Sequence, residues 1–334
     1  MEEIYRKRFK LPSVAIAAFR SGADLQNQFY LQLPAVRKIA LLDQDVSLAK
    51  VRDKVSSNQK VKWIFPSQIL EKQFTKSETS HHKKLDTTAI EPYPTDFNLG
   101  ASNEFEDQIV YWQFKQQSNE TIEKSLTNIL PMVLKNEKII LLMDAPTAQQ
   151  NLIKSLAKQW IKSITTVDPD GSDYQKYFEI GKPQSFSTEA EWIDYLDEHL
   201  EDEPEFLGSE QIHQFYRVGN FLSRIKFVTE KDDINEIFSK IRLFIDQGVQ
   251  ADLRKQILAI STGVPIISFA VTDLVNQGGN GFQKTTSGQL LEQVNYFLQD
   301  LHHWNQGLVD SVSLIEEYEP DKLLKRWKVV MTDG

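Results

Sequence analysis

The sequence of 334 residues contains no cysteine. Disulfide bonds, thiolate metal sites and cysteine nucleophiles are therefore excluded, and the composition fits a reducing compartment. Long apolar runs are also lacking, because no stretch approaches the roughly 20 residues that a membrane-spanning helix needs. The first residues, MEEIYRKRFKLPSV, include no apolar core of signal-peptide length. We therefore expect a cytoplasmic protein without a transmembrane segment, with peripheral contact at the inner face of the membrane as an open alternative.

Positive charge is scarce relative to negative charge. The chain has 38 lysines and arginines against 47 aspartates and glutamates, a formal net charge of −9 at pH 7. A protein whose main partner is a nucleic acid needs clustered cations for the phosphates, so we expect no nucleic-acid partner. The apolar content of 40% and the charged content of 25% are ordinary for a globular protein. The length has room for two domains.

Sequence motifs of the large enzyme classes are missing as well. The chain contains no G-x-G-x-x-G, Walker loop, G-x-S-x-G or H-E-x-x-H. His81 and His82 are adjacent, but no third ligand lies at metal-binding spacing, and a solvated loop is the favoured interpretation. We expect no metal site and no cofactor.

What the chain does have is an alternation of short apolar strands with helical patterns. In residues 1–68, strand patterns at 14–19, 39–42 and 61–65 predict a partial, Rossmann-like α/β region with a parallel sheet. Residues 69–104 are rich in Ser, Thr, Lys and Asn without a helical or strand period, and predict a linker or a surface excursion. The alternation resumes in residues 105–334, with residues 165–185 polar and rich in turn formers. The expected fold class is α/β, with parallel sheets flanked by helices.

Residues 243–269 form the clearest β-α-β unit. Residues 243–245 are a run without polar gaps, typical of a strand buried on both faces, and Asp246, Gln247 and Gly248 are expected to break it. Asp252 is suited to the start of a helix, and Gly263 to its end. The strand at 266–269 follows. A right-handed crossover places both strand ends at one rim of a parallel sheet.

This unit, with Ser-Thr-Gly-Val-Pro-Ile-Ile ending the helix at Gly263 and with Asn280-Gly281 about seventeen residues later, resembles the donor half of a GT-B glycosyltransferase. The resemblance implies a GT-B-like fold, with residues 105–334 as the C-terminal-like Rossmann domain and a C-terminal crossing helix. Active members of the retaining type carry two glutamates, the second five positions before the helix-ending glycine. Gln250 and Leu258 occupy these places here. An isobutyl group cannot stabilise developing charge, so the resemblance implies a pseudo-glycosyltransferase with no catalytic residues.

The stretch Asp-Leu-Arg-Lys-Gln-Ile-Leu-Ala-Ile-Ser-Thr-Gly-Val-Pro looks like the first of the accessory Sec system proteins, a glycosyltransferase-like, non-catalytic family. The resemblance implies a scaffold or chaperone that aids export of glycosylated serine-rich repeat adhesins. Implied partners are the other accessory Sec proteins, the accessory SecA motor and the adhesin. The alternative is an active GT-B glycosyltransferase that uses a nucleotide-sugar donor through other residues. The chain is shorter than expected for this family, so a fragment and a reduced member both stay open.

Three further features have a functional and a plain interpretation. The residues Gly263, Asn280 and Gly281 belong to the degenerate donor-site region, although a plain turn explains the glycines equally well. Acidic residues Asp194, Asp197 and Glu201 on a predicted helix are a candidate partner surface, against a merely solvated helix face. A basic amphipathic pattern at 322–328 suits anionic lipid or a partner, but packing against its own domain is favoured.

Overall fold

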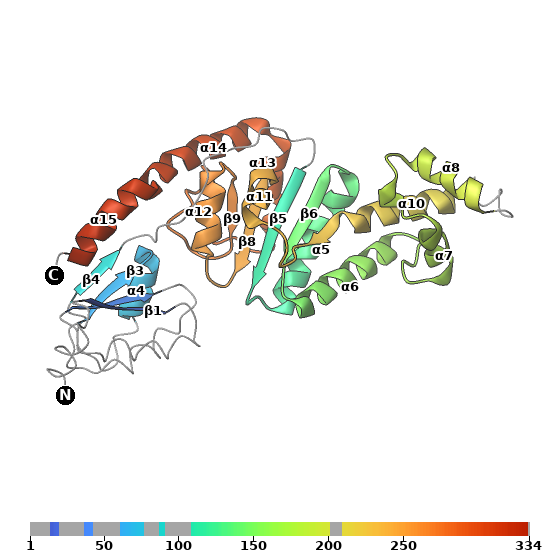
Figure 1. The fold of residues 1–334 in the computed structure, drawn as a ribbon. Coiled ribbons are helices and arrows are strands. Elements are labelled where there is room, and N and C mark those ends of the chain that lie inside the picture. Colours follow the sequence, from blue (N-terminus) through green and yellow to red (C-terminus); the bar gives the residue numbers. More distant parts are fainter. Residues whose placement is uncertain are drawn as a thin grey trace.

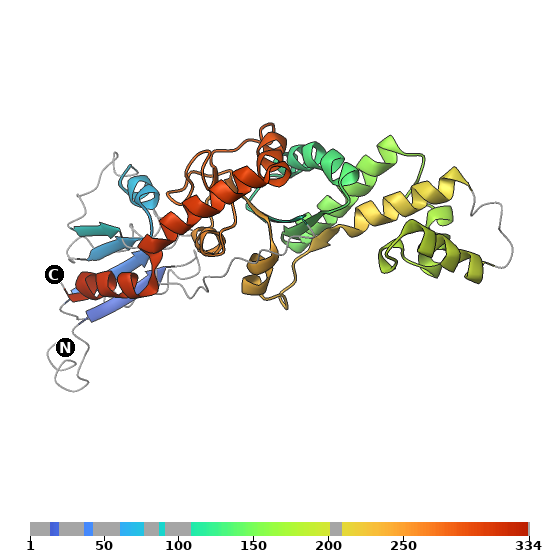
Figure 2. The same ribbon diagram turned by 90° about the horizontal axis from the view of Figure 1, so that it is seen from above.

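The computed structural model describes residues 14–19, 37–42, 61–76, 87–90, 108–200 and 209–332. They form two parallel sheets, a group of helices that projects from the second sheet, and a pair of C-terminal helices (Figures 1 and 2). The expected fold class is confirmed. None of the described helices is long and apolar enough to cross a bilayer.

The first sheet has four parallel strands in the order β1-β2-β3-β4. They are β1 (Val14–Phe19), β2 (Arg37–Leu42), β3 (Lys62–Phe65) and β4 (Thr87–Ile90), and α4 (Gln68–Lys76) follows β3. The three strands predicted between residues 14 and 65 are therefore confirmed. The helices expected between them, and the pair His81-His82, lie outside the described residues.

The expectation of an irregular stretch at 69–104 is wrong at α4 and β4. Ser67 directly precedes α4, and its Oγ accepts a hydrogen bond from Leu70 N at 3.3 Å, while the side chain of Leu70 is buried. Strand β4 pairs along its full length with β3, which supplies its backbone hydrogen bonds. The polar composition did not indicate either element. One buried side chain can stabilise a short helix, and pairing with one neighbouring strand can stabilise a short strand, whatever their local propensity.

The second sheet has six parallel strands in the order β10-β9-β8-β5-β6-β7. They are β5 (Gln108–Lys115), β6 (Ile139–Asp144), β7 (Ile225–Phe227), β8 (Leu243–Gly248), β9 (Ile266–Ser268) and β10 (Gly281–Phe282). Both faces of the sheet are covered. Trp112 and Ile245 point to one face, and Tyr111 and Phe244 point to the other. This double burial explains the apolar strands without polar gaps.

Helices cover the two faces in separate sets. One face packs against α5 (Asn119–Lys135), α6 (Thr147–Ile164) and α13 (Leu290–Gln299). The other packs against α11 (Ile234–Lys240), α12 (Leu253–Ser261) and α14 (Leu301–Ile315). A doubly covered parallel sheet of this kind binds ligands outside the carboxyl ends of its strands.

Between α6 and β7 the chain forms a projection, here called the helical arm. It consists of α7 (Ser172–Ile180), the short 3-10 helix η3 (Pro183–Ser185), α8 (Glu189–His199) and α10 (Glu210–Ser223). The arm extends from the second sheet on the side away from the first sheet (Figures 1 and 2). Trp192 is its central side chain, buried to 1% exposure, with Nε1 donating to Gly181 O at 2.7 Å.

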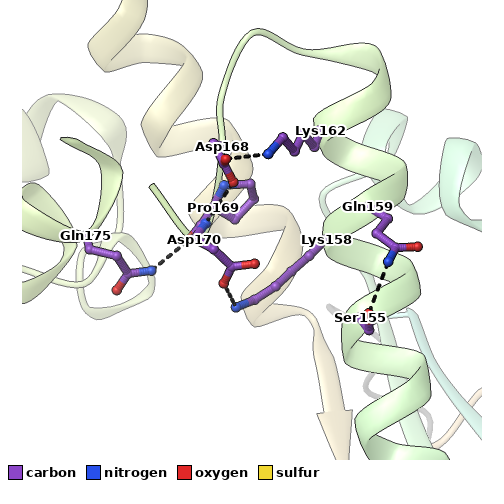
Figure 3. Close-up of polar contacts among 8 residues, drawn as sticks. All are labelled: Ser155, Lys158, Gln159, Lys162, Asp168, Pro169, Asp170 and Gln175. Atoms are coloured by element: carbon purple, nitrogen blue, oxygen red, sulfur yellow. Dashed lines mark hydrogen bonds and ion pairs between the residues drawn. The ribbon is translucent and has the colours of Figure 1, made fainter. Parts of the chain in front are cut away.

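The prediction for 165–185 misses part of this arm. The polar stretch contains α7 and η3, because Tyr174 and Tyr177 are buried against Phe215 of α10. The loop that leads into α7 is held to α6 by two ion pairs, Lys158 with Asp170 and Lys162 with Asp168 (Figure 3). Residues distant in sequence thus complete a small aromatic core that no local period indicates.

The C-terminal helices run from the second sheet to the first (Figures 1 and 2). After α14 come η4 (Glu316–Tyr318) and α15 (Pro320–Thr332), so the crossing predicted as one long helix is broken just before Pro320. Proline suits the first turn of a helix but cannot continue the preceding one. Leu323 of the basic stretch is fully buried, which supports packing against the chain itself.

Candidate functional site

Strand β8 lies beside β5 and β9, and its carboxyl end is the centre of the candidate site. The expectation that Asp246, Gln247 and Gly248 break the strand is wrong, since β8 continues through Gly248. The side chain of Gln247 is fully buried and accepts a hydrogen bond from Trp112 Nε1 at 2.8 Å. Polar residues stay within the strand because each finds a buried partner.

Asp246 is the hub of a buried set of hydrogen bonds, here called the rim network. Its Oδ2 accepts from Asp252 N at 2.7 Å and from Gln256 Nε2 at 2.8 Å. Gln256 Oε1 accepts from Thr272 Oγ1 at 2.6 Å, and Gln113 Nε2 donates to Asp252 Oδ2 at 3.0 Å. The network therefore ties the start of α12 to β5, β8 and the loop after β9.

Burial gives Asp246 unusual acid–base behaviour. Burial raises the pKa of its carboxyl to about 6, and the nearby charge of Asp252 adds to the rise. Within the described part of the chain, neither Asp246 Oδ1 nor Gln113 Oε1 has a hydrogen-bond partner. The signal of this hub in the sequence is faint, namely Asp246 directly after the apolar run of residues 243–245.

A second polar group lies beside α12 and includes Lys255 of that helix. Tyr111 OH donates to Asp144 Oδ2 at 2.6 Å, and Lys255 Nζ pairs with the same oxygen. The ammonium of Lys255 also lies 5.3 Å from the centre of the Tyr111 ring. Burial, with the neighbouring charge of Asp144, raises the pKa of Tyr111 above its usual range. Lys255 is thus engaged by the chain itself.

Between the two sheets lies a cavity of about 290 Å³, here called the cleft cavity. The first-sheet region contributes Ser67, Ile69 and Leu70, and Gln68 N donates to Asp273 Oδ2 of the second-sheet region at 3.0 Å. The loops after β8 and β9 contribute the other wall, which consists of Val249, Gln250, Ala251, Leu253, Phe269, Ala270, Val271 and Thr272. Among the described residues, this lining includes no acidic or basic side chain.

The structure separates the two predicted donor positions. Gln250 is exposed and lines the cleft cavity. Leu258 lies in α12, does not line the cavity and packs against the apolar cluster that includes Ile257 and Phe244.

Gly263, Asn280 and Gly281 have structural roles and do not line the cleft cavity. Gly263 ends α12 with φ of 73°, as the sequence predicted for a helix-ending glycine. Asn280 is buried, with Oδ1 accepting from Asn276 N at 2.7 Å and Nδ2 donating to Leu274 O at 2.9 Å. Gly281 pairs with Ile266, where a Cβ atom would come within 1.9 Å of the carbonyl oxygen. Each of the three thus has a role in a turn, a loop or a strand pair, and their place in a degenerate donor site stays a prediction.

The candidate partner surface lies on α8 of the helical arm, on the opposite side of the second sheet from α4 and α12 (Figure 1). Asp194 and Asp197 are exposed on α8, whereas Trp192 and Leu196 of the same helix are buried. Glu201 lies outside the described residues. In the ranges that the structure describes, no group of three or more His, Asp or Glu side chains is placed to hold a metal ion.

Comparison with known sequences gives consistent matches. A family model described as accessory Sec system protein 1 matches residues 18–333. A curated protein of the same description from Streptococcus gordonii is 26% identical over 239 residues, covering 72% of this chain and 40% of that protein. Another from Staphylococcus aureus is 33% identical over 102 residues, 30% of this chain and 20% of that protein. The matched region thus spans less than half the length of either curated relative.

Comparison with solved structures gives the fold. A chain of the glycosylation-associated protein complex Gap123 from Streptococcus agalactiae matches with a TM-score of 0.59 and 20% identity over 97% of this chain and 56% of that chain. The structure of accessory secretory proteins 1, 2 and 3 from Streptococcus pneumoniae matches with a TM-score of 0.56 and 16% identity. The match covers 98% of this chain and 54% of that chain. The pneumococcal O-GlcNAc transferase GtfA, solved with UDP and GlcNAc, matches with a TM-score of 0.59 and 11% identity. The match covers 98% of this chain and 58% of that chain. The shared architecture is the GT-B fold.

Proposed function

Because the chain belongs to the accessory Sec system protein 1 family, we propose that it acts in that system as a non-catalytic scaffold or chaperone. Its role is to aid export of glycosylated serine-rich repeat adhesins. Its partners are the other accessory Sec proteins, the accessory SecA motor and the adhesin. The solved assemblies of the pneumococcal and Streptococcus agalactiae relatives support a function through complex formation.

The lining of the cleft cavity is the observation that carries the non-catalytic part of this proposal. Glycosyl transfer develops charge at the sugar and at the leaving phosphate, and stabilising it needs charged or strongly polar groups at the reaction centre. Gln250 and Thr272 are the polar side chains that the second-sheet wall offers, beside Val249, Phe269 and Val271. An uncharged amide offers far less stabilisation than a carboxylate.

The two polar groups around α12 support the same proposal. Carboxylates are present nearby, but Asp246 is buried and its Oδ2 accepts two internal hydrogen bonds. Lys255, a cation suited to a phosphate, is paired with Asp144 instead. Lys255 is thus paired within the chain, and Asp246 Oδ2 is bonded within the fold, as expected of a frame retained for its shape.

A turnover assay tests the absence of catalysis. The purified chain is incubated with a panel of nucleotide sugars and candidate acceptors, with an active GT-B transferase as positive control. We expect no product above the blank. Product formation that disappears in Gln250→Ala or Thr272→Ala would show an active cleft and contradict the proposal.

An export assay tests the scaffold role. Deleting the gene in its host is expected to leave the adhesin inside the cell with its sugars largely intact. Complementation with a Gln250→Ala variant should restore export, since the cleft performs no chemistry. If deletion instead leaves the adhesin exported but lacking a sugar, the protein is a transferase and the scaffold role is wrong.

A further inference from the structure

A groove at the root of the helical arm is larger than the cleft cavity. It has a volume of about 720 Å³ and lies between α10, the end of α6 and the end of α5. This volume falls in the range of about 300–1,000 Å³ that ligand sites occupy in proteins. We call it the arm groove.

The groove forms along α10 because only one face of this helix packs into the core of the arm. Ile212, Phe215 and Tyr216 point into the aromatic core of the arm and are buried. Glu210, Gln214 and Arg217 follow the spacing of one helix face and line the groove instead. A hydrogen bond of 2.7 Å from Thr166 Oγ1 to Gln214 Oε1 bridges the two walls. This face of α10 therefore stays accessible beside the bridge.

The floor and edge of the groove are aliphatic. Ile161 and Val218 line it and are themselves packed in the core, with 0% and 1% exposure. Ile164, at the last residue of α6, also lines it and is 51% exposed. An aliphatic occupant would cover Ile164 and remove apolar surface from water, which is favourable.

The charged side chains of the groove favour a cationic occupant. Glu137 and Glu210 line it and are exposed. Burial lowers the pKa of Arg224, and the charge of Glu137 opposes this shift. The guanidinium of Arg224 donates to the carbonyls of Val133 and Asn136 and is largely buried. Arg217 supplies one exposed positive charge on the α10 wall, suited to a backbone carbonyl of the occupant.

The surrounding charge adds to this preference. The segment 165–223, which includes the arm, has fourteen acidic and three basic residues. It therefore carries more negative charge than the whole chain, whose formal net charge is −9. Such a concentration of one sign attracts cations and raises their association rate.

We propose that the arm groove docks a short peptide segment of a partner protein, one in which aliphatic side chains alternate with lysine or arginine. The aliphatic groups lie on the floor beside Val218 and Ile164, and the cations face Glu137 and Glu210. The proposal deepens the scaffold function by assigning it a docking surface, and it rests on that function only for the existence of a partner.

A fluorescence-anisotropy titration tests the groove with a labelled eight-residue peptide of alternating lysine and leucine. We expect saturable binding at low salt. Glu210→Lys should weaken the affinity at least tenfold, and Gln214→Trp, which fills the groove, should remove most binding. Circular dichroism melts of both variants show whether they fold. The matched control is Glu198→Lys, the same charge reversal on an exposed residue of α8 outside the groove, and its affinity should stay within about twofold.

Two peptide controls separate the contributions. A peptide of alternating lysine and serine lacks the aliphatic groups, and one of alternating glutamate and leucine has the wrong charge, so both should bind at least tenfold more weakly. The groove is overturned if no lysine–leucine binding occurs, if the lysine–serine peptide binds equally well, or if Glu198→Lys weakens binding as much as Glu210→Lys. The peptide titration and the export assay are independent. Failure of the docking proposal can therefore be distinguished from failure of the scaffold role.

Discussion

The turn between α12 and β9 depends on the backbone conformation of Gly263. Its φ of 73° is disfavoured for any residue with a side chain, and an added Cβ would lie 2.9 Å from Leu308 Cγ of α14. We expect Gly263→Ala to lower the free energy of unfolding by about 1 kcal/mol or more. Gly288→Ala is the control, since nothing lies within 4 Å of its Cβ position. Urea denaturation measures both, and equal shifts would show that the turn is misplaced.

Asp246 gives the chain a predictable response to pH. Folding raises its pKa from 3.8 to about 6, so between these values the folded chain binds more protons than the unfolded chain. The contribution of Asp246 to the free energy of unfolding therefore falls as pH rises through this window and is constant above it. The loss is about 3 kcal/mol at most.

Asp246→Asn tests this response. Asparagine retains an acceptor for Asp252 N and Gln256 Nε2 but carries no charge. Its stability relative to the unmodified chain should rise between pH 4 and pH 7, whatever constant cost the new amide N–H adds. Urea denaturation across this range measures the difference. Parallel pH profiles of the two proteins would contradict a raised pKa.

At the scale of elements, the helical arm is held by its aromatic core more than by its ion pairs. Lys158 with Asp170 and Lys162 with Asp168 connect α6 to the loop before α7, but all four side chains are substantially exposed (Figure 3). Exposed pairs of this kind contribute little to stability, because water and salt screen them. Trp192 is buried and also makes a hydrogen bond, so its loss affects both packing and a polar partner.

We therefore expect Trp192→Ala to destabilise the arm by about 3–5 kcal/mol, whereas Lys158→Ala should cost about 1 kcal/mol or less. Limited proteolysis followed by mass spectrometry measures local unfolding of the arm. New cleavage sites between residues 165 and 223 should appear in the tryptophan variant first. Similar digestion of the two variants would mean that the ion pairs, not the aromatic core, hold the arm.

At the scale of the whole molecule, charge is divided unevenly between arm and body. The segment 165–223 has a larger net negative charge than the full chain. The remaining residues together therefore carry a slightly positive net charge. Long-range attraction between such an arm and a basic partner mainly accelerates encounter and is screened by salt. The exposed Asp194 and Asp197 of α8 are the proposed contact residues.

Charge reversal on α8 checks this proposal. The double variant Asp194→Lys/Asp197→Lys should associate with a purified accessory Sec partner at least several-fold more slowly at low salt, with an unchanged melting temperature. The difference should shrink in about 0.5 M salt, because screening then acts within a few ångströms. Surface plasmon resonance at several salt concentrations provides the rates. Identical association rates at low salt would identify these aspartates as merely solvated.

The sequence alone determined features whose cause is local. Runs such as residues 243–245 indicate buried strands, Asp252 predicts a helix start that its side chain indeed caps at Lys255 N, and Gly263 predicts the turn. These features depend on backbone sterics and on short-range periodicity. By contrast, the assignment of Gln250 and Leu258 to the two donor positions comes from the family resemblance and stays a prediction.

Tertiary structure decided what depends on partners far along the chain. Gln113 reaches Asp252 across 139 positions, and this contact joins β5 to the polar hub around Asp246 at the end of β8. Strand β4 and the arm exist because pairing and aromatic packing outweigh their polar composition. The position of Gln250 in the cleft cavity and of Leu258 in an apolar cluster follows from how α12 packs. No local pattern specifies such contacts, because their energies arise only when the folded chain brings distant side chains together.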